Sequence, residues 1–161
     1  MAKTVIMNNT LEIVNPLHKN VSILLVEDND IDAMGVKRAF AREKIDNPLH
    51  RAEDGVAALE LLRSSDSRQI RQPRIMLVDI NMPRMNGLEF IAALRQDETL
   101  KRSIVFVLTT SKSKQDQIDA YNLNIAGYII KDSSGSDMAQ IVDMLRHYCD
   151  TVELPDTPRI N

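Results

Sequence analysis

Five short apolar runs, separated by stretches with helical periodicity, constrain the fold more than any other feature of this sequence. The clearest run, residues 103–108, is uninterrupted and rich in the β-branched residues that favour strands. The other four strands are predicted over 21–26, 48–52, 73–78 and 126–130. Apolar residues at spacings of three and four predict five helices: over 30–43, from Gly55, from Gly87, over 113–123 and over 136–148. Asn124 is predicted to end the fourth of them in the left-handed conformation. This alternation predicts an α/β fold, with a parallel sheet covered by helices on both faces.

The composition suits one soluble domain. The chain has 161 residues, is 43% hydrophobic and carries a net charge of -3, which gives no support to nucleic acid or membrane as the main partner. No run approaches the roughly 20 apolar residues of a membrane span. The single cysteine, Cys149, excludes an intrachain disulfide and is expected to be a partly buried small hydrophobe. We therefore expect a cytoplasmic protein.

The domain is predicted to span residues 21–149. Residues 1–20 contain only short apolar pieces and lack the continuous apolar core of a secretory signal, so they are interpreted as an N-terminal extension of unreadable role. Residues 150–161 contain two prolines and no periodicity, which indicates a C-terminal tail.

Polar side chains of a particular kind stand at the ends of four predicted strands. Glu27 and Asp28 end the first, Asp79 ends the third, Thr109 ends the fourth and Lys131 ends the fifth. In open α/β sheets, the carboxyl ends of the strands are where ligands bind. In a sheet of order 2-1-3-4-5 the first and third strands are neighbours, so the three acids are expected to lie close together.

This acidic cluster predicts a metal site. Two unit charges 4 Å apart repel by about 4 kcal/mol at an effective dielectric near 20, so the cluster requires a cation or a raised pKa. Oxygen ligands with open positions favour Mg²⁺, which keeps several waters. We expect Asp28 and Asp79 to hold it, with Glu27 acting mainly through water. The backbone carbonyl of Asn81 is a further candidate ligand.

The same edge has what a phosphoryl acceptor requires. Lys131 and the metal would neutralise charge on the phosphoryl oxygens, while the Thr109 hydroxyl and the backbone N–H of Thr110 would bind those oxygens. Asp79 is then the nucleophile, and an aspartyl phosphate forms. Each residue alone has an ordinary explanation; Asp28, for example, would be a helix N-cap. Their coincidence at one edge favours the phosphoacceptor interpretation.

These residues resemble the receiver domain of two-component response regulators, over residues 21–148. The resemblance implies a flavodoxin-like (βα)5 fold, a doubly wound parallel sheet of order 2-1-3-4-5, which is also the order of the chemotaxis receiver. The motifs that carry it are Leu24-Leu25-Val26-Glu27-Asp28-Asn29, Leu77-Val78-Asp79-Ile80-Asn81-Met82-Pro83 with Gly87, Leu108-Thr109, and Gly127-Tyr128-Ile129-Ile130-Lys131.

The resemblance implies a single-domain regulator that is a phosphoacceptor with self-catalysed phosphorylation and dephosphorylation, rather than an enzyme. A sensor histidine kinase would donate the phosphoryl group to Asp79, and a protein target or phosphotransfer protein would read the result. Thr109 would move toward the phosphate and Tyr128 would turn inward, which changes an interaction surface. The implied Mg²⁺ ligands are Glu27, Asp28, Asp79 and the Asn81 carbonyl.

A finer resemblance is to stand-alone receivers that partner phytochrome-type histidine kinases. It is carried by Tyr148, by Val152-Glu153-Leu154-Pro155, by the loop 64–73 and by Thr109-Thr110-Ser111. It leaves both a monomer and a homodimer open. The chain departs from the family where Asp132 follows Lys131 in place of the usual proline, and where Thr110 replaces a commonly smaller residue.

Three other functions share part of this pattern. A haloacid dehalogenase-type phosphatase would need a second aspartate as general acid at position 81, where Asn81 stands. A DNA-binding regulator would need a helix-turn-helix or a basic patch after the receiver. A receiver-like binding module that works without phosphorylation remains the alternative, although the intact set of acids, Thr109 and Lys131 argues against it.

Overall fold

The computed structural model describes residues 3–7, 10–14, 21–64, 70, 74–132 and 138–155, with only the backbone described for 3–7 and 10–14. Most of the 64–73 loop, the start of the last predicted helix at Ser136 and the end of the predicted tail therefore lie outside the described residues.

A five-stranded parallel sheet forms the centre of the described fold. The strands lie in the order β4-β3-β5-β6-β7, which is the predicted order 2-1-3-4-5 when this sheet is numbered by itself. The five predicted strands are thus confirmed, each starting within one residue of its expected position. They are β3 (Ser22–Val26), β4 (Leu49–Ala52), β5 (Arg74–Val78), β6 (Ile104–Thr109) and β7 (Gly127–Ile130).

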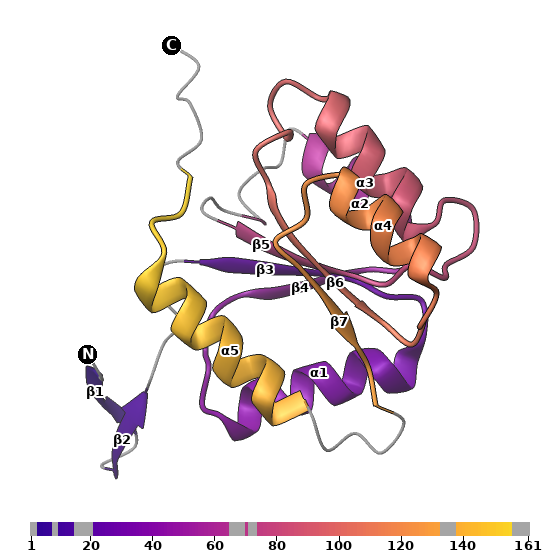
Figure 1. The fold of residues 1–161 in the computed structure, drawn as a ribbon. Helices are drawn as coiled ribbons and strands as arrows, with labels where there is room; N and C mark the ends of the chain where they lie inside the picture. Colours follow the sequence, from indigo (N-terminus) through magenta and orange to yellow (C-terminus); the bar gives the residue numbers. More distant parts are fainter. Residues whose placement is uncertain are drawn as a thin grey trace.

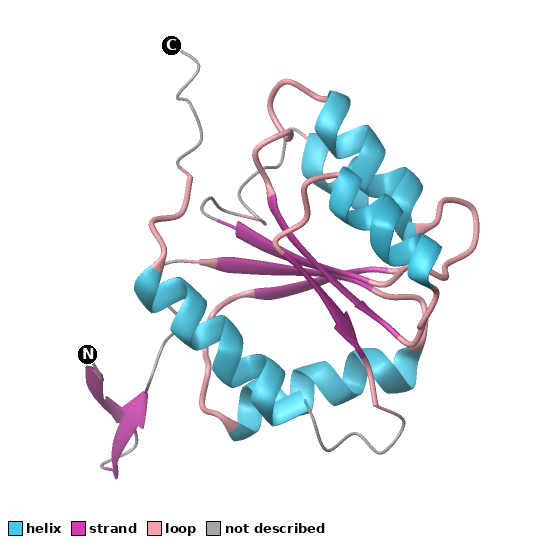
Figure 2. Ribbon diagram, in the orientation of Figure 1, coloured by secondary structure: helices cyan, strands magenta, loops and turns pink. Residues whose placement is uncertain are grey.

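Helices cover both faces of the sheet (Figure 1, Figure 2). Two of them, α1 (Asp30–Arg42) and α5 (Met138–Thr151), lie on one face. On the other lie α2 (Gly55–Arg63), α3 (Gly87–Gln96) and α4 (Lys114–Asn122). A side-chain oxygen caps the N-terminus of each of α1 to α4, as the Asn29 side chain does by accepting from the Asp32 N–H. After α4, Asn124 adopts the predicted left-handed conformation with φ 57°.

Strand residues alternate between two hydrophobic cores, because successive side chains point to opposite faces. In β3, Ile23 and Leu25 pack toward α1 and α5, while Leu24 and Val26 pack toward α2, α3 and α4. All four are buried, which explains why these strands read as continuous apolar runs.

The structure differs from the sequence-based expectation at both ends. Within residues 1–20, β1 (Lys3–Met7) and β2 (Thr10–Val14) pair as an antiparallel hairpin that was not predicted. At the other end, α5 continues to Thr151, three residues beyond the predicted end at Tyr148. Cys149 explains the extension, because it continues the buried stripe one turn after Leu145.

Cys149 is fully buried and is a free thiol. Burial raises the pKa of this thiol to about 12, so at neutral pH it stays protonated. The expected packing role is thus supported, but the residue is fully buried and not partly buried as predicted.

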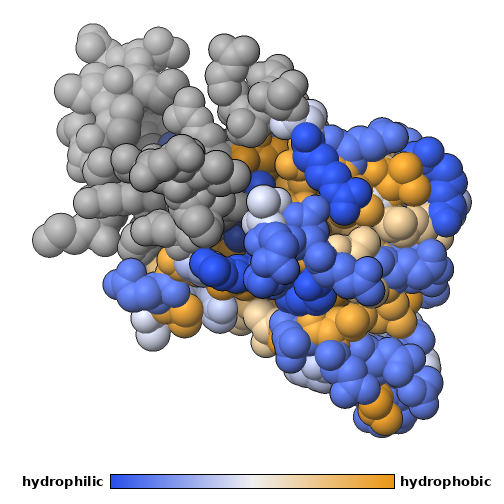
Figure 3. Space-filling model, turned by 90° about the horizontal axis from the view of Figure 1, so that it is seen from above, coloured by the Kyte–Doolittle hydropathy of each residue, from blue (hydrophilic) through white to orange (hydrophobic). Residues whose placement is uncertain are grey.

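The surface seen from above the α2, α3 and α4 layer is mainly hydrophilic, with smaller hydrophobic areas between (Figure 3). Within the described part of the chain, none of the helices combines the length and the apolar character that a membrane crossing requires.

Gly87 lets α3 begin directly against Asp79, the residue that follows β5. A Cβ at this position would clash with the Asp79 carbonyl oxygen and lie 2.9 Å from the Cα of Ile80. The Gly87 N–H also donates to the Ile80 carbonyl at 2.9 Å, which closes the loop after Asp79.

We expect Gly87→Ala to lower the free energy of unfolding by about 1–3 kcal/mol, because backbone must shift to admit the methyl group. Gly35 in α1 is the matched control, since a Cβ there meets nothing within 4 Å. Gly35→Ala should raise the free energy of unfolding by about 0.5–1 kcal/mol. Urea unfolding measures both, and a Gly87→Ala protein as stable as wild type would contradict the close approach.

Candidate functional site

Backbone pairing continues one residue past the strand ends and brings the predicted side chains together. The Asp79 N–H donates to the Val26 carbonyl at 3.0 Å, so Asp79 stays in register beside Glu27. Between β6 and β7, the Lys131 N–H donates to the Thr109 carbonyl at 2.7 Å. The site is therefore built on the ordered ends of β3, β5, β6 and β7.

The three predicted acids converge. Carboxylate oxygens of Glu27, Asp28 and Asp79 all lie within 4.8 Å of one another. Glu27 and Asp79 are buried and Asp28 is exposed, so the cluster opens to solvent on the side of Asp28. An all-oxygen donor set of this kind fits a hard divalent cation.

Lys131 is the ammonium at the centre of the cluster. Its Nζ lies 2.8 Å from Glu27, 2.9 Å from Asp32 and 3.9 Å from Asp79, and 8% of its side chain is exposed. One ammonium thus faces three carboxylates, with Asp28 beside them. The surplus of negative charge supports the fit to a cation.

The environment shifts two pKa values in the cluster. Burial raises the pKa of Glu27 above its usual value, although hydrogen bonds from Lys131 and the Asn29 N–H act in the opposite direction. Burial alone would lower the pKa of Lys131, but its hydrogen bonds to Glu27 and Asp32 outweigh burial and raise that pKa. Lys131 is therefore a permanent positive charge at neutral pH.

The two carboxylate oxygens of Asp79 have different surroundings. Oδ1 accepts a hydrogen bond from the Ile80 N–H at 2.8 Å. Oδ2 faces the Lys131 ammonium at 3.9 Å, beyond hydrogen-bond distance. Oδ2 is thus the oxygen better suited to form a new bond.

Thr109, Ser111 and Tyr128 form a hydrogen-bonded connection from the site toward α4. The buried Thr109 hydroxyl accepts from the Ser111 N–H at 3.3 Å, and the Tyr128 hydroxyl donates to the Ser111 carbonyl at 3.0 Å. The Ser111 hydroxyl donates to Asp116 in the first turn of α4. Tyr128 is half-buried against the core under α4, and Thr110 is exposed between Thr109 and Ser111.

The loop that follows Asp79 is tied to α2 by an ion pair. Arg84, whose φ is 61°, donates to both carboxylate oxygens of Asp54, at 2.6 and 3.0 Å. Asp54 is buried and also caps α2 by accepting from the Ala57 N–H at 2.9 Å. Its hydrogen bond from Arg84 is the main cause that holds the pKa of Asp54 below its usual value.

Sequence reasoning missed two residues of this region, Asp32 and Arg51. Asp32 lies one helical turn after Asp28, a spacing that could have indicated its contact with Lys131. Arg51, in β4, contacts the loop that carries Glu27 and Asp28. An arginine in a short edge strand is not in itself a signal for that contact.

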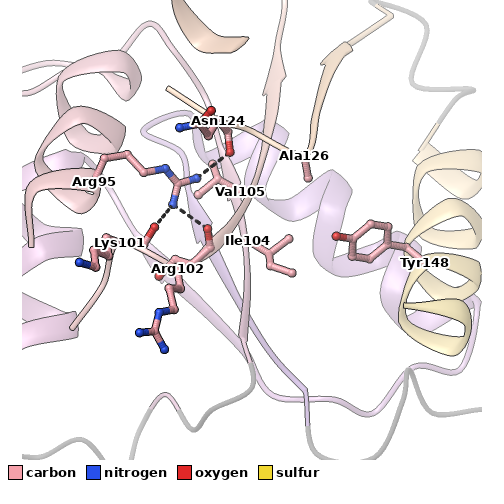
Figure 4. Close-up of a pocket in the computed structure, with 9 residues that line it drawn as sticks. Arg95, Lys101, Arg102, Ile104, Val105, Asn124, Ala126 and Tyr148 are labelled. Carbon is pink, nitrogen blue, oxygen red and sulfur yellow. Dashed lines mark hydrogen bonds between the residues drawn. The ribbon is translucent and has the colours of Figure 1, made fainter. Parts of the chain in front are cut away.

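A cavity of about 280 Å³ lies away from this cluster, where β6 begins (Figure 4). Arg95 fills its polar wall by donating to the carbonyls of Leu123, Asn124, Lys101 and Ser103. Tyr148 lines the opposite side of the cavity. Its ring packs edge-on against that of Phe106, with 5.2 Å between the ring centroids. These contacts give Arg95 and Tyr148 structural roles.

Comparison with protein families gives a match to one family model. The model of the response regulator receiver domain matches residues 23–143. The probable methanogenesis regulatory protein FilR2 of Methanothrix harundinacea is 36% identical over 126 residues, covering 78% of this chain and 81% of FilR2. Response regulator Rcp1 of Synechocystis is 34% identical over 135 residues, covering 83% of this chain and 92% of Rcp1.

Solved structures give the same result. The phosphorylated cyanobacterial phytochrome response regulator RcpA has a TM-score of 0.76 and 32% identity, with 85% of this chain and 99% of that chain covered. The Mn²⁺-bound form of Rcp1 has a TM-score of 0.74 and 34% identity, with the same coverage of both chains.

We expect Asp54→Asn to lower the free energy of unfolding at pH 7 by about 1–2 kcal/mol. Asparagine can still cap α2, but it lacks the negative charge that pairs with Arg84. A pKa that is lowered in the folded state stabilises above the unfolded value of about 3.9. The gap between wild type and Asp54→Asn should therefore narrow as the pH falls below about 4.

Urea unfolding at pH 7 and at pH 3 measures this gap. Arg84→Gln removes the other partner and should also lower the free energy of unfolding at pH 7. A gap of equal size at both pH values would mean that the ion pair does not contribute to stability.

Proposed function

Because this chain belongs to the family of response regulator receiver domains, we propose that it accepts a phosphoryl group on Asp79 from a sensor histidine kinase. The observation that carries the proposal is the convergence of Glu27, Asp28 and Asp79 at one edge of the sheet, with the Lys131 ammonium against Glu27 and Asp79. We further propose that residues 21–149 form the receiver unit and that the protein acts in the cytoplasm.

Asp79 Oδ2 attacks phosphorus as the bond to the donor histidine breaks, and the histidine nitrogen keeps that electron pair. The Lys131 ammonium, 3.9 Å from Oδ2, neutralises charge that develops on the phosphoryl oxygens. The Thr109 hydroxyl and the Thr110 N–H bind these oxygens from the side of β6.

Glu27, Asp28 and Asp79, with the Asn81 carbonyl, would hold Mg²⁺, which when bound supplies charge neutralisation at the transferring group. Glu27 already accepts from Lys131 and from the Asn29 N–H, so it would act mainly through water, while Asp28 and Asp79 would be the direct ligands. The Mn²⁺-bound structure of Rcp1 supports a divalent ion in a related protein.

The connection through Ser111 would carry the signal outward. When Thr109 turns its hydroxyl to a phosphoryl oxygen, the Ser111 N–H loses its acceptor. The Ser111 carbonyl accepts a hydrogen bond from Tyr128 in β7, and the Ser111 hydroxyl donates one to Asp116 in α4. A shift of this loop would therefore move β7 and α4 together. We propose that this surface contacts a downstream protein or a phosphotransfer protein.

The kinase partner we propose is of the phytochrome type. RcpA is named as a phytochrome response regulator, and it covers 85% of this chain. Of the residues that carry the finer resemblance, Tyr148 lies in α5 and Leu154 packs against the core under α5.

Incubation with acetyl phosphate and Mg²⁺ should add one phosphoryl group to wild type and none to Asp79→Asn, because the amide lacks the nucleophilic carboxylate oxygen. Asp46→Asn, on an exposed turn away from the cluster, is the matched control and should be labelled like wild type. Intact-mass spectrometry and loss of the label in hydroxylamine measure the acyl phosphate. Labelling of Asp79→Asn at the wild-type level would overturn the site.

Transfer from purified histidine kinases then identifies the donor. A phytochrome-type kinase should label wild type faster than unrelated kinases do, and again not Asp79→Asn. If wild type stays unlabelled by every donor while a cellular output persists in Asp79→Asn, the chain is the phosphorylation-independent binding module.

We expect Tyr128→Phe to uncouple the surface from the site, because the variant keeps the ring and loses the bond to the Ser111 carbonyl. BeF₃⁻ with Mg²⁺ should still bind, but amide NMR shifts in α4 and β7 should be smaller than in wild type. Tyr121→Phe is the control; its hydroxyl accepts only from the Tyr128 N–H among the described residues. Equal shifts in Tyr128→Phe and wild type would contradict the coupling.

A further inference from the structure

Arg51 binds the backbone of the loop that carries two of the three acids. Its Nε donates to the Glu27 carbonyl at 2.9 Å, and its Nη2 donates to the Asp28 carbonyl at 3.1 Å. Its Nη1 pairs with the carboxylate of Asp30 at 2.7 Å. One side chain thus contacts three of the residues that connect β3 to α1.

These bonds continue the sheet where β4 stops. The last backbone rung between the two strands is the Glu27 N–H donating to the Ala52 carbonyl at 3.0 Å. The Glu27 carbonyl faces the same neighbour but has no strand residue to accept from, and Arg51 supplies the missing donor. The Arg51 side chain is 18% exposed, so it lies largely inside the protein.

The orientation of the Asp28 carboxylate depends on this contact more than that of the Glu27 or Asp79 carboxylate does. The carboxylate of Glu27 is held by Lys131 and by the Asn29 N–H, and that of Asp79 by the Ile80 N–H. Among the described residues, none donates a hydrogen bond to the Asp28 carboxylate. The direction of that side chain is therefore set by its backbone, and Arg51 binds the carbonyl of that backbone.

We propose that Arg51 is a positioning residue of the metal site, which orders the Glu27–Asp28 turn before the cation binds; this inference rests on the function proposed above. Two effects of the guanidinium oppose each other. Its positive charge repels a divalent cation, and its hydrogen bonds pre-arrange the cation's ligands. Because Asp30 pairs with the charge, pre-arrangement is the larger effect.

The opposition makes the test sharp: on charge alone, loss of the guanidinium should strengthen cation binding, whereas loss of a positioning residue should weaken it. We expect Arg51→Gln to bind Mn²⁺ and Mg²⁺ about tenfold more weakly than wild type, as loss of groups that orient metal ligands typically does. Arg51→Lys keeps the charge and loses the fork, and it should show a similar loss. Free Mn²⁺ measured by electron paramagnetic resonance and calorimetry with Mg²⁺ give the dissociation constants.

Arg63→Gln is the matched control. Arg63 pairs with Asp97 at 3.2 Å near the C-termini of α2 and α3, and its loss should leave cation binding unchanged. Thermal unfolding without metal separates ordinary destabilisation from positioning, and Arg51→Lys carries the test should Arg51→Gln not fold.

If Arg51→Lys bound the cations as tightly as wild type, the charge of residue 51 and not its hydrogen bonds would determine the affinity. If Arg51→Gln bound them as tightly as wild type or more tightly, the positioning role would be overturned. Either result leaves the proposed function intact as long as wild type binds the cation and is phosphorylated. Absence of Mn²⁺ and Mg²⁺ binding by wild type would instead overturn the metal-dependent function, and this inference with it.

Discussion

The Lys131 ammonium is the charge on which the arrangement of the site depends. The Lys131 side chain is 8% exposed, and its ammonium lies within ion-pair distance of Glu27, Asp32 and Asp79. Removing one partner of a buried pair is far more costly than the pair is worth, typically about 3–5 kcal/mol, because the remaining charge is uncompensated. The two buried carboxylates, Glu27 and Asp79, can therefore lie side by side at this edge of the sheet because the ammonium balances part of their charge.

The fold and most of the site followed from the sequence because strand ends are readable. Each central strand is a continuous apolar run, so the first polar residue after it marks the ligand-binding edge of the sheet. Asp79 and Lys131 were found in that way, and their ion-pair contact is confirmed. Asn124 was also correctly identified, because few residues other than glycine tolerate a positive φ.

What the sequence did not predict depends on contacts between residues far apart in the chain. Arg51 reaches Glu27 only because β4 pairs with β3, and its own strand gives no indication of the direction of its side chain. Asp32 was read as part of a helix start, and its contact with Lys131 spans 99 positions. The β1–β2 hairpin was missed because only its second strand alternates polar and apolar residues, over residues 10–13, whereas the first contains the continuous apolar piece 5–7.

The burial of Cys149 has a practical consequence for following the molecule in solution. Its thiol is enclosed under α5 and remains protonated at neutral pH, so it reacts slowly with maleimides and other thiol reagents. A cysteine introduced on the exposed face of α4 would then carry a fluorophore or spin label at one chosen position. The native chain is in this respect already a background for site-directed spectroscopy.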